Sequence, residues 1–144
     1  MAATVFLVTP GSLIAIVDDD PSVRRSPRRL VESAGYRVQT FATASEFLAF
    51  LAGSGTACLV LDVHLDGMSG FELQERLAAD GVQVPVIFIT VHDAPATRAR
   101  IERSGAAAHL WKPFDDTALL DAIRRVVGTL EQGPTGGPAS RRRE

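Results

Sequence analysis

The sequence predicts an α/β domain in which a five-stranded parallel sheet is covered by helices on both faces. Short apolar runs alternate with segments of helical spacing along the chain, as is typical of parallel sheets whose strands are joined by helices. Four of these runs are followed by, or end in, a residue that can handle a metal or a phosphoryl group: Asp18, Asp62, Thr90 and Lys112. Because the carboxyl ends of parallel strands line one crevice, we expect these side chains to meet there.

The first half of the chain gives two strand and helix pairs. Residues 13–17 are apolar and predict a strand, and Asp20 with Pro21 suits the start of a helix that ends near Gly35. Residues 36–40 alternate apolar and polar side chains and predict the second strand, and residues 43–52 predict a helix. Pro27 falls inside the first helix, where a proline removes a hydrogen bond at a cost of ~3 kcal/mol. We expect a kink there.

The second half repeats this order. Strands are expected over residues 58–61, 86–90 and 107–111. Ser69 and Glu72 have the spacing of a capping box and open a helix that reaches about residue 80. A helix near residues 95–104 ends at Gly105, and the last helix begins at Asp115 or Asp116 and places one apolar face inward: Leu119, Ile123, Val126 and Leu130.

The two ends lie outside this pattern. Residues 1–12 contain a short apolar piece followed by a Pro-Gly-Ser turn, and we expect a flexible arm rather than an additional docked strand. Residues 131–144 are rich in glycine and proline and indicate a linker or disordered tail. The arginines at 141–143 are interpreted as a solvated charge run, because a nucleic-acid contact would need a folded platform with interleaved aromatics.

Composition limits the classes of function. The 144 residues, 46% of them hydrophobic, suffice for one globular domain. The net charge of −2 gives no reason to expect a nucleic-acid or membrane surface. No apolar stretch approaches the ~20 residues of a membrane span, and no basic segment indicates a secretory signal, so we expect a cytosolic domain. The single cysteine, Cys58, lies in an apolar run and is interpreted as a buried, inert thiol.

Several other phosphate and metal sites do not fit the pattern. The chain has no Gly-rich Walker loop. A haloacid-dehalogenase-type phosphatase is the nearest enzymatic alternative, but His64 stands where it needs a second acid, and Asp66 lies four residues beyond Asp62. The three histidines, His64, His92 and His109, lie on separate segments without the spacing of a transition-metal site.

Four motifs, in order, make the chain resemble the receiver domain of a two-component response regulator. They are Ile-Val-Asp-Asp-Asp-Pro at 16–21, Leu-Asp-Val-His-Leu-Asp-Gly-Met-Ser-Gly at 61–70, Phe-Ile-Thr at 88–90 and Lys-Pro-Phe at 112–114. The resemblance implies a flavodoxin-like, doubly wound (βα)5 domain over residues 13–130, and a cytoplasmic signalling domain rather than a turnover enzyme. Residues 41–48 are similar to the branch that often carries a LuxR-type output domain.

The resemblance assigns a phospho-acceptor and a Mg²⁺ site. Asp62 matches the phospho-acceptor, and Asp18 and Asp19 match the acidic pair that holds Mg²⁺, with Asp19 as a direct ligand and Asp18 acting through water. Asp62 and the backbone carbonyl of His64 would complete the protein ligands. The assignment is chemically coherent because Mg²⁺ prefers oxygen ligands and phosphoryl transfer depends on positioning and charge neutralisation.

The resemblance also implies a switch and partners. Thr90 matches the switch hydroxyl, Lys112 the lysine of the site, and His109 the switch aromatic. A histidine kinase or a phosphotransfer protein would supply the phosphoryl group. Phosphorylation would change the face formed by the fourth helix, the fifth strand and the fifth helix, which also allows a homodimer. We expect neither nucleic-acid nor membrane contact by this chain.

Some residues depart from the family pattern. His109 replaces the usual Tyr or Phe, Val91 replaces a small residue after Thr90, and Asp66 stands where proline is common. The departures at Val91 and His109 support the alternative of a pseudo-receiver, a binding module that gains no phosphate. The family pattern also predicts a cis peptide between Lys112 and Pro113, a form that only ~5–6% of such bonds adopt. The sequence leaves open the cognate kinase and whether an output domain follows residue 130.

Overall fold

The structure is a computed structural model and describes residues 11–91 and 93–132. Most of the expected N-terminal arm, residues 1–10, and most of the expected tail, residues 133–144, lie outside the described residues. Gly11 and Ser12 are described and lead into the first strand, with the Gly11 amide donating to the Gly35 carbonyl at 2.7 Å.

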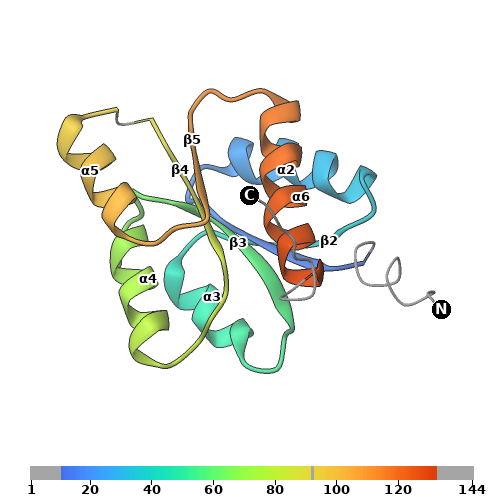
Figure 1. The fold of residues 1–144 in the computed structure, drawn as a ribbon, viewed down its shortest axis with the longest axis horizontal. Coiled ribbons are helices and arrows are strands. Elements are labelled where there is room, and N and C mark those ends of the chain that lie inside the picture. The colour runs from blue at the N-terminus through green and yellow to red at the C-terminus, as the bar shows by residue number, and fades with distance from the viewer. Residues whose placement is uncertain (1–10, 92, 133–144) are drawn as a thin grey trace.

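Five parallel strands form one sheet, as the sequence predicted (Figure 1). Their order across the sheet is β2-β1-β3-β4-β5, so the chain reverses its direction of winding between β1 and β3. In open sheets of this kind the crevice at such a switch point is the usual ligand site. The strands are β1 (Leu13–Val17), β2 (Arg37–Phe41), β3 (Thr56–Asp62), β4 (Val86–Thr90) and β5 (Ala108–Trp111).

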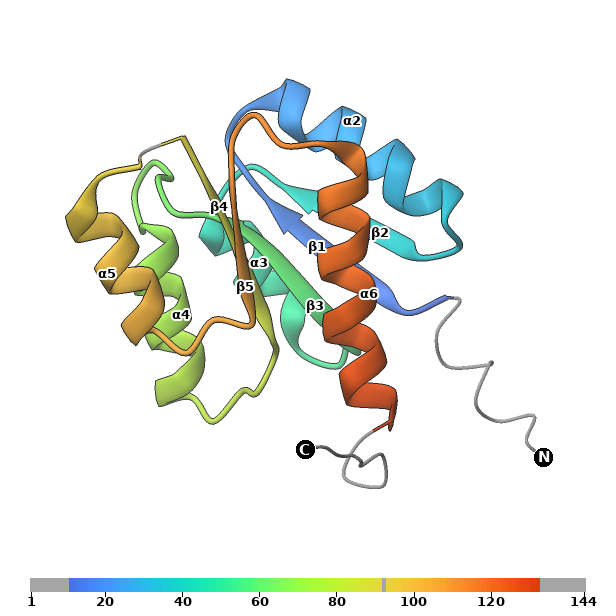
Figure 2. The ribbon, with the colours of Figure 1, turned by 45° about the horizontal axis from the view of Figure 1, so that its top comes forward.

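Five helices cover the two faces of the sheet (Figure 2). Helices α2 and α6 pack on one face, and α3, α4 and α5 pack on the other. The helices are α2 (Pro21–Ser33), α3 (Ala44–Leu51), α4 (Gly70–Ala79), α5 (Pro95–Arg103) and α6 (Asp116–Gln132). The doubly wound (βα)5 fold is therefore confirmed.

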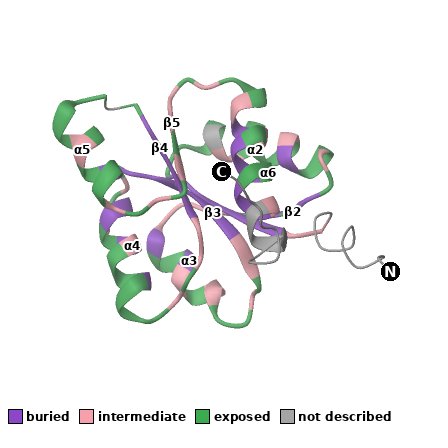
Figure 3. Cartoon of the chain, in the orientation of Figure 1, coloured by how far each residue is buried: buried purple, intermediate pink, exposed green. Residues whose placement is uncertain are grey.

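The two apolar cores follow from the period-two alternation of the central strands. In β1, Ile14 and Ile16 point to the side of α2 and α6, whereas Ala15 and Val17 point to the side of α3 and α4. Every residue of β1 and β4 is buried, as Figure 3 shows for the centre of the sheet. Full burial on both faces explains why these strands are continuous apolar runs in the sequence.

Two of the helix caps expected from the sequence are present, whereas a cap of the last helix by Asp115 or Asp116 stays a prediction. The Asp20 side chain accepts from the Ser22 amide at 2.9 Å and begins α2. Ser69 and Glu72 form both hydrogen bonds of a capping box at the start of α4, satisfying amides that have no partner within the helix.

Several element boundaries differ from the prediction by one or two residues. Strand β3 begins at Thr56, two residues before the apolar run, because Thr56 pairs with Leu13 of β1. Helix α6 continues to Gln132, past the expected end near Leu130. Helix α2 continues through Pro27 and ends at Ser33, close to the expected end. The kink at Pro27 stays a prediction. Within the described residues, no helix is long and apolar enough to cross a membrane.

The position of Pro27 gives a stability prediction. Replacing Pro27 with alanine supplies an amide for the helix and removes the steric conflict with the preceding turn. We expect Pro27→Ala to raise the free energy of unfolding by about 1–3 kcal/mol, measured by urea denaturation. Ser26→Ala is the control at the exposed neighbouring position. An unchanged or lower stability of Pro27→Ala would contradict the prediction.

Candidate functional site

Three carboxylates meet at the carboxyl edge of the sheet. Asp18 follows β1 and Asp62 is the last residue of β3, and these two strands are neighbours. One carboxylate oxygen each of Asp18, Asp19 and Asp62 lies within 4.8 Å of the other two. Asp18 is 0% exposed and Asp62 is 6% exposed, whereas Asp19 is exposed. The structure thus brings Asp18 and Asp62 together, as their positions at the strand ends predicted.

Lys112 reaches this acidic group from the end of β5, an edge strand of the sheet. Its Nζ lies 2.7 Å from Asp18 Oδ2 and 3.2 Å from Asp62 Oδ2, so one ammonium bridges two buried carboxylates. The residue directly follows β5, and its amide donates to the Thr90 carbonyl at the end of β4 at 2.8 Å. The predicted cis peptide between Lys112 and Pro113 is confirmed.

The ionisation of Asp62 reflects its surroundings. Burial raises the pKa of Asp62 to about 6, from an ordinary 3.8, and the nearby Asp18 charge acts in the same direction. The His64 amide, which donates to Asp62 Oδ1 at 3.0 Å, and the Lys112 ammonium both oppose this rise. For Lys112, burial lowers the pKa, but the hydrogen bond to Asp18 and the charges of Asp62 and Asp18 outweigh it, so its pKa is raised. The lysine is therefore held as a cation.

Asp18 is fixed by its own turn. Its Oδ1 accepts from the Asp20 amide at 2.9 Å, and its amide donates to the Phe41 carbonyl at 3.0 Å. The Arg24 guanidinium also donates to the Asp18 carbonyl at 2.8 Å. This contact of Arg24 was not foreseen from the sequence, although its position six residues after Asp18 in a predicted helix placed it within reach.

The donor set suits a hard divalent cation. All three groups are carboxylates, and Mg²⁺ prefers oxygen ligands and retains several waters. The Asp18 carboxylate is already committed to Lys112 and to the Asp20 amide, whereas Asp19 is exposed at the mouth of the group. Asp19 thus has a carboxylate available for direct ligation. The triad is of the kind that is typical of a receiver Mg²⁺ site; ligation by the His64 carbonyl stays a prediction.

The residues expected to form the switch, Thr90 and His109, lie on the neighbouring strands β4 and β5 but are not register partners. Thr90 is 0% exposed at the end of β4, and its strand partner in register is Trp111. His109 is exposed, and its ring packs edge to face on Trp111 with centroids 5.4 Å apart. Val91 is 60% exposed, so its side chain lies at the surface next to Thr90. The inward movement of His109 and an effect of Val91 on access to Asp62 both stay predictions.

Arginines of α5 make contacts that the sequence did not indicate. Arg98 pairs with Asp93 and lies over the Trp111 ring, 4.9 Å from its centroid. Arg100 lies 4.3 Å from the Phe71 ring centroid and 3.4 Å from Glu75, both in α4. Helix α5 is therefore held largely by surface contacts, since Ile101 is its only buried residue.

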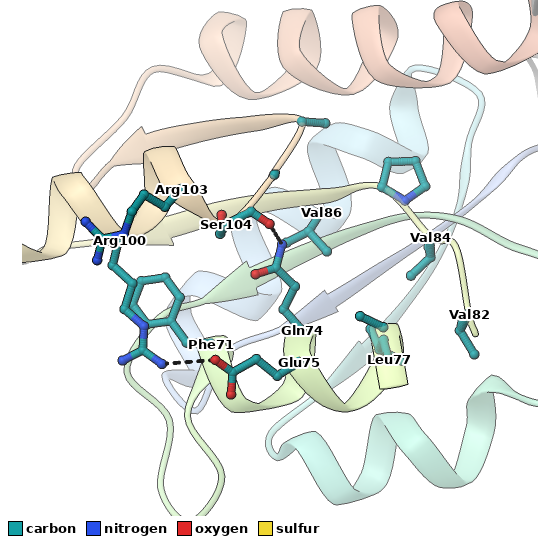
Figure 4. Close-up of a pocket in the computed structure, with 14 residues that line it drawn as sticks. Phe71, Gln74, Glu75, Leu77, Val82, Val84, Val86, Arg100, Arg103 and Ser104 are labelled. Carbon is teal, nitrogen blue, oxygen red and sulfur yellow. Dashed lines mark hydrogen bonds and ion pairs between the residues drawn. The ribbon is translucent and has the colours of Figure 1, made fainter. Parts of the chain in front are cut away.

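A cavity of about 590 Å³ separates α4 from α5 (Figure 4). Gln74 crosses it and donates to the Ser104 carbonyl at 3.1 Å, and the pair of Arg100 and Glu75 borders it. None of the acidic residues of the site lines this cavity. We therefore place the chemistry at the group of Asp18, Asp62 and Lys112, where the buried charges are.

Comparison with known families agrees with this geometry. Residues 14–124 match the family described as the response regulator receiver domain. The chain therefore belongs to the response regulator receiver family, whose members are signalling modules of phosphorelays rather than turnover enzymes.

Similar proteins are regulators of the LuxR/FixJ type. Nodulation protein W of Bradyrhizobium diazoefficiens is 44% identical over 113 residues, which cover 78% of this chain and 49% of that protein. Transcriptional regulatory protein FixJ of Azorhizobium caulinodans is 39% identical over 126 residues, covering 86% and 60%. The solved structure of response regulator StyR is 46% identical with a TM-score of 0.75, covering 82% and 60%. The chain thus spans 49% to 60% of these relatives.

The raised pKa of Asp62 predicts a pH-dependent effect of its removal. Because the folded-state pKa, about 6, exceeds the ordinary 3.8, the folded state binds the proton more tightly, and ionisation of Asp62 costs stability as pH rises from about 4 through 6. Without a divalent cation, we expect Asp62→Asn to be more stable than the wild type by about 1–3 kcal/mol at pH 7 and by little at pH 4.

Chemical denaturation in EDTA at several pH values measures this difference. Asp66→Asn, an exposed carboxylate of the adjoining loop, is the matched control and should show no such trend. A stability difference between Asp62→Asn and the wild type that is the same at pH 4 and pH 7 would contradict the prediction.

Proposed function

We propose that Asp62 accepts a phosphoryl group from the phosphohistidine of a histidine kinase or phosphotransfer protein in a Mg²⁺-dependent reaction. The observation that carries the proposal is the buried Asp62 carboxylate, which lies within the acidic triad and 3.2 Å from the Lys112 ammonium. Membership of the receiver family implies a cognate histidine kinase. The family is generally cytoplasmic, and we infer the same location for this chain.

The chain's own residues supply the nucleophile and its orientation. A carboxylate oxygen of Asp62 attacks phosphorus, the bond from phosphorus to the donor imidazole nitrogen breaks, and its electron pair remains on the imidazole. The His64 amide and Lys112 hold the two carboxylate oxygens at 3.0 and 3.2 Å. Such fixed geometry lowers the entropic part of the barrier. When bound by Asp18, Asp19 and Asp62, Mg²⁺ would neutralise charge on the phosphoryl oxygens.

Lys112 and Thr90 then respond to the new phosphoryl group. Lys112 already contacts both buried carboxylates, so it is placed to pair with an anion on Asp62. Thr90 is buried at the end of the strand adjacent to β3, on the same edge as Asp62. We infer that its hydroxyl engages the phosphoryl group and that the rearrangement passes to β5 through the register partner Trp111.

The responding surface in this proposal is the face formed by α5, β5 and α6. Helix α5 has one buried residue and no side-chain cap, so it is loosely held and able to move. A hollow of about 340 Å³ on this face is lined by residues of all three elements, among them Ile101, His109 and Arg125. We propose that this face binds a partner or a second copy of the chain when Asp62 is phosphorylated.

Acetyl phosphate with Mg²⁺ tests the phospho-acceptor. Intact mass should show the gain of one phosphoryl group by the wild type and none by Asp62→Asn, because the amide is not a nucleophile. Asp66→Asn should be labelled like the wild type. No gain of mass by the wild type would favour a pseudo-receiver binding module, and turnover of many equivalents of acetyl phosphate would favour a phosphatase.

Mg²⁺ affinity tests the two acidic residues that follow β1. We expect Asp19→Ala to weaken Mg²⁺ binding about tenfold or more, and Asp18→Ala to weaken it less, because Asp19 is proposed to bind the ion directly and Asp18 through water. Trp111 is the single tryptophan and precedes Lys112, so its fluorescence provides the titration signal. Equal Mg²⁺ affinities of the wild type and Asp19→Ala would refute the assignment.

A further inference from the structure

Gly70 occupies a place where no side chain fits. It is buried and is the first residue of α4. A Cβ at this position would lie 2.4 Å from the Asp62 carbonyl oxygen and 3.0 Å from Val63 Cα. At Gly67 and Gly128 nothing lies within 4 Å of the corresponding position. Gly70 also has no positive φ, so the constraint is the space around it and not its backbone conformation.

The atoms that such a side chain would meet belong to the backbone of the proposed phospho-acceptor, Asp62, and of the next residue, Val63. They cannot rotate away as a flexible side chain would. The following residue, Val63, is held on both sides: its amide donates to the Ile89 carbonyl at 3.0 Å, and its carbonyl accepts from the Gly70 amide at 2.9 Å. The end of β3 therefore lies between β4 and the first turn of α4.

We propose that Gly70 is a positioning residue for phosphoryl transfer, because it lets the first turn of α4 rest directly on the backbone of Asp62. This inference rests on the proposed function of Asp62. The buried side chains of Leu73 and Leu77 fix α4 in turn. A larger residue at position 70 has to displace the end of β3, and with it the Asp62 carboxylate relative to Lys112 and Asp18.

The effect of Gly70→Ala should appear in chemistry more than in binding of the donor. Displacements of about 1 Å at a reacting group can cost ~10²-fold in rate. We expect Gly70→Ala to reduce the saturating rate of acetyl phosphate labelling about 10- to 100-fold, with a smaller change in the half-saturating concentration. We also expect weaker Mg²⁺ binding in the Trp111 fluorescence titration, because Asp62 is one of the three carboxylates.

Two control variants separate positioning from stability. Ser69→Ala removes the side-chain cap of the same helix without touching Asp62, so it should lower the melting temperature and leave labelling and Mg²⁺ binding unchanged. Gly128→Ala adds a methyl group to a helical glycine in open space and should leave all three readouts unchanged or raise the melting temperature. All variants are also made with Pro27→Ala, which is expected to keep destabilised chains folded.

Each outcome decides the proposal. A Gly70→Ala variant with wild-type labelling rate and Mg²⁺ affinity overturns it. The proposal is also overturned if Ser69→Ala has the same melting temperature as Gly70→Ala and loses labelling to the same extent. A Gly70→Ala chain that does not fold even with Pro27→Ala would show a requirement of the fold and would also overturn it. If the wild type gains no phosphoryl group, the proposed function of Asp62 fails, and the Mg²⁺ titration alone then decides whether Gly70 positions the carboxylate.

Discussion

The contact of one ammonium with two buried carboxylates is the interaction on which the site depends. Lys112 contacts Asp18 and Asp62, which lie 94 and 50 positions before it in the chain. Burying two carboxylates beside each other is costly, and breaking such a group by removal of the cation leaves uncompensated charge. The buried acids at the ends of β1 and β3 therefore depend on the turn after β5, which places Lys112 beside them.

One lysine does not compensate three acids. Burial is the main cause of the raised pKa of Asp62, and the neighbouring Asp18 charge adds to it although Lys112 opposes the rise. A divalent cation bound by these carboxylates, as proposed, would offset the cost of burying them. Cation binding and the free energy of unfolding are linked for this reason. The buried acids that serve the proposed chemistry therefore lower the stability of the fold.

The central strands that carry the acids are held more firmly than helix α5. β1 is buried throughout and β3 is buried from Cys58 to Asp62, and the end of β3 is held by β4 and by Gly70 at the start of α4. By contrast, α5 contributes one buried residue and is held by surface contacts of Arg98 and Arg100 with aromatic rings and acids. In the proposed function, a firmly held acceptor beside a loosely held helix would let a local change of charge move a surface.

The sequence by itself determined the fold class, the helix caps and the strand ends that carry Asp18, Asp62, Thr90 and Lys112, because periodicity and capping are local signals and parallel strands share one edge. It did not determine the first residue of β3, which depends on pairing with β1. Only the tertiary structure decided that Asp18 is buried while Asp19 is exposed, that Arg24 contacts the Asp18 backbone, and that Gly70 rests on the Asp62 carbonyl. These contacts depend on strand order, register and the close approach of backbones, none of which a local pattern of side chains encodes.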